Sequence, residues 1–131
     1  MEKGKAVELE VWVGKAARTN FAIFDTLSRE SPQSLKQLQR HVCKYPGLEE
    51  IYYASLTKRL HCLEKKGYVQ QVVSGSGGLK VRVYELRLKA CLVMFLKHVS
   101  LQDILDVASD TQVACLLLVL LNVYSAKGFE G

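Results

Sequence analysis

The segment from Leu56 to Val69 constrains the fold more than any other part of this 131-residue sequence. Its leucines at 56, 60 and 63 and its glycine at 67 recur at helical spacing. At about 100° per residue these four positions fall within roughly 60° of one another, so they face a core on one side of a helix. Gly67 is the natural end of that helix, because glycine readily adopts the left-handed conformation that follows a helix C-terminus.

Two helices are predicted upstream of this segment. Apolar residues at helical spacing predict the first from about Lys15 to Ser28. The second begins at Ser34, because Ser34 and Gln37 have the spacing of a capping box, in which both side chains satisfy free backbone N–H groups. It ends near Tyr45, where a Tyr-Pro-Gly sequence breaks the helix.

A third helix and two strands follow. The helix is predicted from about Glu49 to Lys66, with Gly67 as its stop. The strands are predicted over Tyr68–Val73 and Lys80–Leu86, joined by a Ser-Gly-Ser-Gly-Gly tip that suits a hairpin. Further upstream, apolar residues alternate with Glu8, Glu10 and Trp12 over residues 6–13. This pattern predicts a half-buried strand, with a helix as the alternative.

The C-terminal region is predicted to be helical. The expected helices are Leu88 to about Val99, a short helix capped by Ser100 and ending near Ala108, and Thr111 to about Ala126. The longest apolar run, residues 113–121, is about half the length that spans a bilayer, so no membrane association is expected.

The last helix is apolar around most of its circumference, which indicates burial on more than one side. We expect a second copy of the chain to provide the cover, while a monomer whose C-terminal helices fold back over the rest is the alternative. The predicted dimer-interface residues are Leu92, Phe95, Leu96, Leu116, Leu117, Leu120, Leu121 and Tyr124.

Positive charge is concentrated in the middle of the chain, which has a net charge of +5. Residues 34–73 hold seven basic and three acidic side chains, and residues 74–90 hold four basic and one acidic. Residues 91–131 hold two basic and four acidic side chains. Clustered positive charge of this kind is what neutralisation of nucleic-acid phosphates requires.

The order of three helices, a strand, a glycine-rich tip and a strand resembles the winged helix-turn-helix family of bacterial and archaeal transcriptional regulators. The resemblance covers roughly residues 15–86, and its most specific part is Leu56-x3-Leu60-x2-Leu63-Glu64-x2-Gly67-Tyr68-Val69. It implies a mainly α fold with a small antiparallel β wing. Residues 1–87 would form the winged helix-turn-helix domain and residues 88–131 a C-terminal helical dimerisation region.

The same resemblance implies that the protein binds double-stranded DNA. The outward side of the third helix would enter the major groove, while the second helix and the wing would contact phosphates. Tyr52 is expected to pack against the core, and Tyr53 to reach a phosphate. The predicted DNA-binding residues are Lys36, Arg40, Tyr53, Ala54, Ser55, Thr57, Lys58, His61, Lys65, Lys80 and Arg82.

One departure from the family pattern leaves the function open. The stretch between Leu38 and Leu60 is several residues longer than in a compact helix-turn-helix, so either the loop or the third helix is extended. If the helix is extended, Glu49 and Glu50 lie at its groove-entering end, where carboxylates repel phosphate. The alternative function is a winged-helix protein-protein interaction module in a transcription or replication assembly.

Enzymatic and metal-dependent functions have no support in the sequence. The four cysteines are separated by at least 19 residues, and the three histidines lie on separate predicted elements. We therefore expect isolated buried thiols, no metal, no cofactor and no catalytic site. The expected location is the cytoplasm, in association with the nucleoid.

Overall fold

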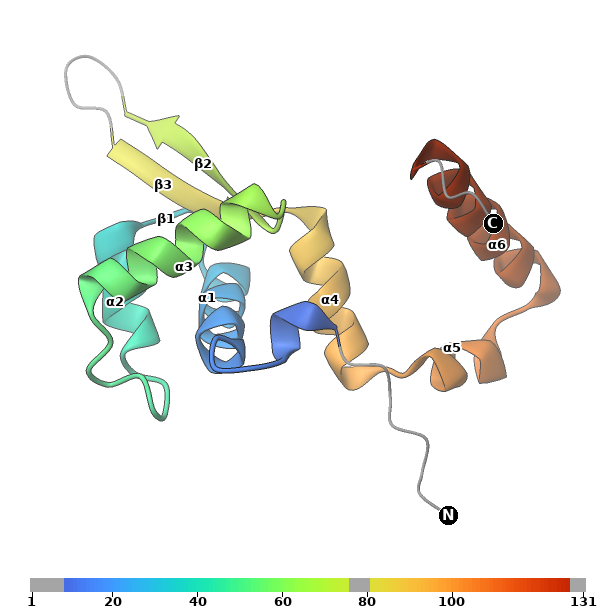
Figure 1. Cartoon of the computed structure of the whole chain (residues 1–131), viewed down its shortest axis with the longest axis horizontal. Coiled ribbons are helices and arrows are strands. Elements are labelled where there is room, and N and C mark those ends of the chain that lie inside the picture. The colour runs from blue at the N-terminus through green and yellow to red at the C-terminus, as the bar shows by residue number, and fades with distance from the viewer. Residues whose placement is uncertain (1–8, 76–80, 128–131) are drawn as a thin grey trace. The chain divides into compact units, whose positions relative to one another are not determined.

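The computed structural model describes residues 9–75 and 81–127 and divides the chain into two compact units, Met1–Phe95 and Leu96–Gly131. In its described residues the first unit contains a short 3₁₀ helix, three α-helices and three strands (Figure 1), and the fourth α-helix crosses the boundary between the two units. In chain order the elements are η1 (Glu10–Trp12), α1 (Ala17–Arg29), β1 (Gln33–Ser34), α2 (Leu35–Val42), α3 (Tyr53–Lys65), β2 (Val69–Ser74), β3 (Val81–Leu86), α4 (Leu88–His98), α5 (Leu101–Val107) and α6 (Asp110–Lys127).

The sheet is antiparallel, with the strand order β1-β3-β2. Strands β2 and β3 pair in register from Val69 opposite Leu86 to Ser74 opposite Val81. Helices α1 and α2 contact β3, and α3 contacts β2. Three helices with a β-hairpin beside the third form a winged helix-turn-helix, which confirms the predicted fold class.

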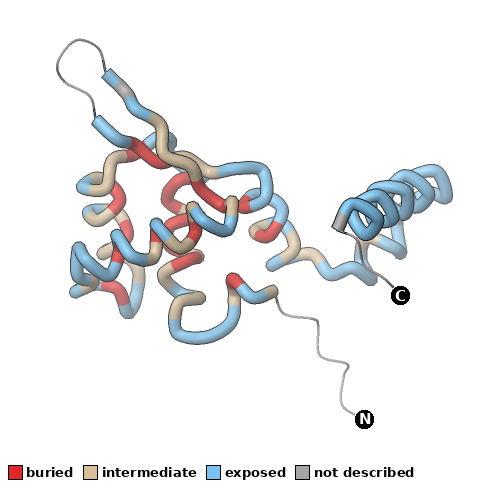
Figure 2. Tube along the Cα trace, turned by 45° about the horizontal axis from the view of Figure 1, so that its top comes forward, coloured by how far each residue is buried: buried red, intermediate tan, exposed pale blue. Residues whose placement is uncertain are grey.

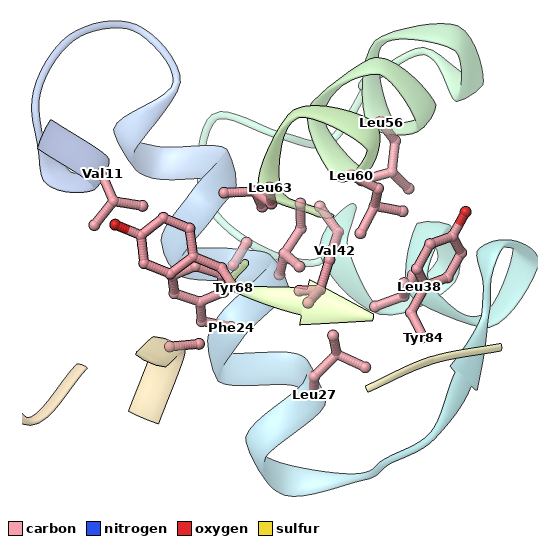
Figure 3. Close-up of a cluster of buried hydrophobic side chains, with 14 of the residues drawn as sticks. Val11, Phe24, Leu27, Leu38, Val42, Leu56, Leu60, Leu63, Tyr68 and Tyr84 are labelled. Carbon is pink, nitrogen blue, oxygen red and sulfur yellow. The ribbon is translucent and has the colours of Figure 1, made fainter. Parts of the chain in front are cut away.

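The core of the first unit lies between α1, α2, α3 and the sheet (Figure 2). The leucines of α3 point into it, with Leu56 and Leu60 fully buried and Leu63 2% exposed (Figure 3). They meet Phe24 of α1 and Val42 of α2, which are also fully buried. The inward side predicted for the third helix is therefore confirmed.

The predicted capping box starts α2. The Ser34 hydroxyl accepts a hydrogen bond from the Gln37 N–H at 3.2 Å, and the Gln37 side chain accepts one from the Ser34 N–H at 2.8 Å. Ser100 and Asp103 make the same reciprocal arrangement at the start of α5. These bonds satisfy donors that helix geometry leaves unpaired, so both starts were predictable from local sequence.

The strand predicted upstream of the first helix is wrong where the structure describes it. Residues 10–12 form η1 instead, with Val11 buried. The Trp12 indole N–H donates to the carbonyl of Val93 at 3.1 Å, and Trp12 also packs edge-on against Phe24. Tertiary contacts, and not a strand partner, therefore order this segment, while residues 6–8 lie outside the described residues.

The prediction that the third helix begins at Glu49 is also wrong, because α3 begins at Tyr53. The extra residues form a loop that is closed by local contacts. The Glu49 carboxylate accepts a hydrogen bond from the Gly47 N–H at 3.0 Å, and Leu48 is buried. Gly47 has a φ of +85°, a conformation that glycine adopts without the steric cost other residues incur.

Strand β1 has no counterpart among the predicted elements. Its Gln33 is fully buried, and its Nε2 donates to the carbonyls of Thr26 at 3.2 Å and Glu30 at 2.6 Å. Its Oε1 lies 2.7 Å from Nδ1 of His41 on α2. The two bonds from Nε2 fix the orientation of the amide, and an amide oxygen can only accept, so the Nδ1–H of His41 donates to Oε1. Gln33 thus joins the end of α1, the sheet and α2.

Helix α4 extends the first unit beyond residue 87, where the sequence pattern placed the domain boundary. Ala90 is fully buried and Val93 is 6% exposed in the core of this unit. The Lys89 ammonium donates to the carbonyl of Lys66 at 2.7 Å and lies 4.6 Å from the ring centroid of Tyr68. The unit therefore continues to Phe95.

The second unit contains α5 and α6. Every described side chain of α6 from residue 110 to 126 is exposed, including eight large apolar ones and Tyr124. A helix at a protein surface normally has one polar side and one apolar side. Helix α6 lacks this division. Within the described ranges, no helix is both long and apolar enough to cross a membrane.

Candidate nucleic-acid interface

The outward side of α3 is small, polar and positive. Burial of the leucine stripe turns Lys58, His61 and Lys65 away from the core, and all three are exposed. Ala54 and Ser55 are exposed on the first turn of the same helix. Small residues allow a helix backbone to approach a nucleic-acid groove, and the lysines and the histidine can donate hydrogen bonds to base edges or phosphates.

Thr57 differs from its neighbours in the use of its hydroxyl. The Oγ1 donates to the carbonyl of Tyr53 one turn earlier, at 2.9 Å. The hydroxyl proton is thus used within the helix, which leaves the methyl group as the accessible apolar part of an exposed side chain.

The hairpin of β2 and β3, called the wing from here on, contacts α3 around the hydroxyl of Tyr84. Burial raises the pKa of Tyr84, the carboxylate of Glu64 raises it further, and the guanidinium of Arg82 opposes the shift. Gln71 of β2 donates to the Tyr84 hydroxyl at 3.2 Å and to Glu64 at 3.4 Å. Arg82 and Tyr84 lie on the same face of β3, since strand residues alternate. Arg82 is therefore exposed on the side of the wing that adjoins α3.

Lys36 and Arg40 form an exposed basic pair on α2. They are four residues apart, so they lie on one side of the helix, while Leu38 and Val42 on another side are buried. The start of the helix is held next to the wing, because Gln33 and Ser34, which directly precede it, pair with Tyr84 and Val83 in the sheet. One compact unit thus carries α2, α3 and the wing.

The two tyrosines at the start of α3, Tyr52 and Tyr53, differ in how far their side chains are exposed. Tyr52 is 77% exposed, so the prediction that it packs against the core is wrong. Tyr53 is 47% exposed, beside Tyr84 of the wing. The loop that pulls Leu48 into the core places Tyr52 at the N-cap with an extended backbone, which turns its ring to solvent.

All predicted DNA-binding residues that the structure describes are at least partly exposed, and Lys80 lies outside the described residues. Two further basic residues, Arg59 of α3 and Lys66 at its C-cap, were not predicted as site residues. Lys66 lies 2.7 Å from Glu10, whose pKa is lowered by that hydrogen bond and charge. The spacing of α3 places Arg59 and Lys66 between its leucine side and its outward side. This position could have been derived from the sequence.

Comparisons with known proteins add little to this description. No protein-family model matches the sequence, and no curated protein matches it. The chain is similar to a solved structure described as the crystal structure of Streptococcus pneumoniae FabT in complex with DNA, with a TM-score of 0.48 and 20% sequence identity. The similarity covers 88% of this chain and 80% of that chain. At this identity two chains can differ in function, so a function for this protein has to be argued from its own residues.

The cysteines are all free, but the prediction that they are buried is wrong. Cys43 and Cys62 are partly buried, whereas Cys91 and Cys115 are exposed. Cys91 and Cys115 lie on the apolar helices α4 and α6, whose surfaces are largely exposed in the single chain. Within residues 9–75 and 81–127 no group of three or more His, Cys, Asp or Glu side chains could hold a metal ion.

Proposed function

We propose that this protein binds double-stranded DNA in a sequence-specific manner, as a dimeric transcriptional regulator that acts by occupying its site in the cytoplasm, at the nucleoid. The observation that carries the proposal is the set of exposed cationic side chains on α2, α3 and the wing of one compact unit. The position of Glu49 and Glu50 supports it, since both precede α3 and Glu49 is bonded to Gly47. The objection that carboxylates at the start of α3 would repel phosphate in the major groove is therefore weaker.

In the proposed complex α3 lies in the major groove. Ala54 and Ser55 permit close approach, and Lys58 and His61 donate to base edges. The methyl group of Thr57 offers an apolar contact to a thymine methyl. The flanking contacts to phosphates come from Lys36, Arg40, Tyr53, Lys65, Lys80 and Arg82, and they position the helix without reading sequence.

The salt dependence of binding tests this proposal. The five cationic phosphate contacts proposed for each protomer predict a log–log slope of about −9 for a dimer on a palindromic site, at roughly −0.9 per neutralised phosphate. Affinity should then fall on the order of 10⁵-fold between about 50 and 200 mM salt.

The measurement is fluorescence anisotropy at several salt concentrations, with duplexes selected by the protein from a random pool. A scrambled duplex of the same length is the control for specificity. If selection enriches no sequence and the slope is shallow, the DNA function is wrong, and the winged-helix protein-interaction module becomes the better candidate.

A second copy of the chain is the proposed cover for the apolar helices. Leu116, Leu117 and Leu120 of α6 are 39–54% exposed, and Leu92 and Phe95 of α4 are 56% and 53% exposed. Exposed apolar side chains of this extent mark an interaction site, and a twofold axis places the same residues of two copies against each other. Two wings related by that symmetry suit successive major grooves of a palindrome. The proposed interface also includes Leu96, Leu121 and Tyr124.

Glutamates placed on α6 should dissociate this dimer. Leu117→Glu combined with Leu120→Glu puts two charges on the proposed interface, and burying unpaired charge is strongly unfavourable. Sedimentation or light scattering at micromolar concentration should show a dimer for the native chain and a monomer for the variant. Asn122→Glu with Ala126→Glu, which adds the same charge on the opposite side of α6, is the matched control. A native chain that is monomeric at this concentration contradicts the dimer.

A further inference from the structure

A cavity of about 160 Å³ lies behind the proposed DNA-reading side of α3, within the first unit. Its walls come from η1, the start of α1, α3 and the residues that lead into β2. Apolar and charged groups both line it: Glu10, Val11, Val13, Ala16, Asn20, Arg59, Cys62, Leu63, Lys66 and Tyr68. Cavities of about 150 Å³ accept a benzene-sized molecule, so this one suits a ligand body of about six carbon atoms.

Asn20, which lines the cavity, has an unused hydrogen-bond acceptor. The residue is 3% exposed, and its Nδ2 donates to the carbonyl of Val11 at 2.8 Å. That bond fixes the orientation of the amide, because a flipped amide would set two acceptors against each other. Its Oδ1 is buried and has no hydrogen-bond partner among the described residues. A buried acceptor without a partner is unfavourable, so a donor brought by a ligand would be stabilised there.

The charges that line the cavity favour an anionic ligand. Glu10 and Lys66 neutralise each other at 2.7 Å. Arg59 is partly buried and makes no ion pair with any residue in the described part of the chain. A guanidinium presents a planar pair of donors that matches a carboxylate. Arg59 therefore favours a ligand that carries a carboxylate over one that does not.

We propose that this cavity binds a small organic acid with a compact apolar body and a hydrogen-bond donor, namely a 2-hydroxy or 2-amino acid with an aliphatic side chain. The carboxylate pairs with Arg59, the hydroxyl or ammonium group donates to Asn20 Oδ1, and the side chain packs against Val11, Ala16 and Leu63. These three features of the cavity select three features of one ligand.

Occupancy of the cavity has a consequence for DNA binding that rests on the proposed function. Arg59, Cys62 and Lys66 line the cavity, while Lys58, His61 and Lys65 of the same helix face outward. A ligand that moves α3 on one side therefore moves the reading side chains on the other. DNA affinity should then depend on the ligand, and the ligand's affinity on DNA to the same factor.

A matched ligand series tests the site without DNA. The probes are 2-hydroxy-4-methylpentanoate, leucine, 4-methylpentanoate without the donor, and 3-methylbutylamine without the carboxylate, each titrated into the full chain by calorimetry. We expect saturable binding of the hydroxy acid or leucine, about tenfold weaker binding of 4-methylpentanoate because it makes one hydrogen bond fewer, and none of the amine. Amide resonances of Asn20 and Arg59 should shift with the same saturation curve.

Two variants and one control complete the experiment. Arg59→Met should weaken binding of the acid at least tenfold, and Ala16→Met should weaken it by filling the cavity, with thermal unfolding measured to verify the fold. Lys58→Met, the neighbouring outward lysine, should leave ligand binding unchanged. Absence of saturable binding at millimolar ligand, or binding that Arg59→Met does not change, overturns the site. Saturable binding with unaltered affinity for a selected duplex overturns the coupling to DNA.

Discussion

Replacement of both Lys58 and Arg82 by alanine is expected to weaken binding to a selected DNA duplex by about 100-fold, since each contact is worth roughly 1–3 kcal/mol. Lys58 lies on the outward side of α3 and Arg82 on the face of the wing that adjoins α3, so the pair removes one cation from each element. The salt slope should become shallower by about one unit for each phosphate that the variant no longer neutralises. Anisotropy titrations at two salt concentrations measure both effects.

The control for this pair removes the same charge from the opposite side of the unit. Lys15 precedes α1 and Arg29 ends it, and α1 packs against the buried side of α3. Lys15→Ala with Arg29→Ala should change duplex affinity by no more than a few-fold, because distant surface charges are screened. Equal affinity of the native chain and the Lys58/Arg82 variant would show that α3 and the wing do not bind DNA.

Leu60→Ala should destabilise the first unit by about 2–5 kcal/mol, the range for a fully buried leucine that leaves a cavity. Leu60 is 0% exposed and lies in the core with Leu38 and Val42 of α2 (Figure 3). That destabilisation is a large part of the roughly 5–15 kcal/mol that stabilises a typical domain. Urea denaturation should show a lower midpoint with an unchanged slope.

Leu88→Ala is the matched control for the core substitution. Leu88 is 86% exposed at the start of α4, so its truncation should alter the free energy of unfolding by no more than about 0.5 kcal/mol. Both variants need the same protein concentration, because dimerisation would make stability depend on it. A midpoint for Leu60→Ala equal to that of Leu88→Ala would contradict the core position of α3.

The elements that were predicted correctly are those with a local physical cause. Gly67 ends α3 with a φ of +86°, and the Ser34–Gln37 and Ser100–Asp103 pairs start their helices, because backbone groups at helix ends need partners nearby. Errors occurred where distant residues decide the structure. The upstream segment has the alternation of a strand, but the contact of Trp12 with Val93 holds it in η1, and β1 is only two residues long.

The candidate DNA-binding residues also divide into those that the local sequence predicts and those that distant contacts decide. The outward positions of α3 could be derived from its leucine spacing, because one side of a helix fixes the other. The position of Arg82 beside α3 depends on the register of β3 and on Tyr84, which no local pattern encodes. The cavity next to Asn20 was likewise beyond prediction, since it needs η1, α1 and α3 in place.

Periodicity and capping in the sequence alone determined the three helices, the hairpin and the inward side of the Leu56–Val69 segment, because those features depend on residues within a few positions of one another. The tertiary structure decided that α3 begins at Tyr53, that Glu49 belongs to a loop, and that Lys66 rather than Arg59 pairs with Glu10. Burial of Leu48 and the approach of η1 to α3 fix these outcomes, and both depend on contacts between segments that are distant in the chain.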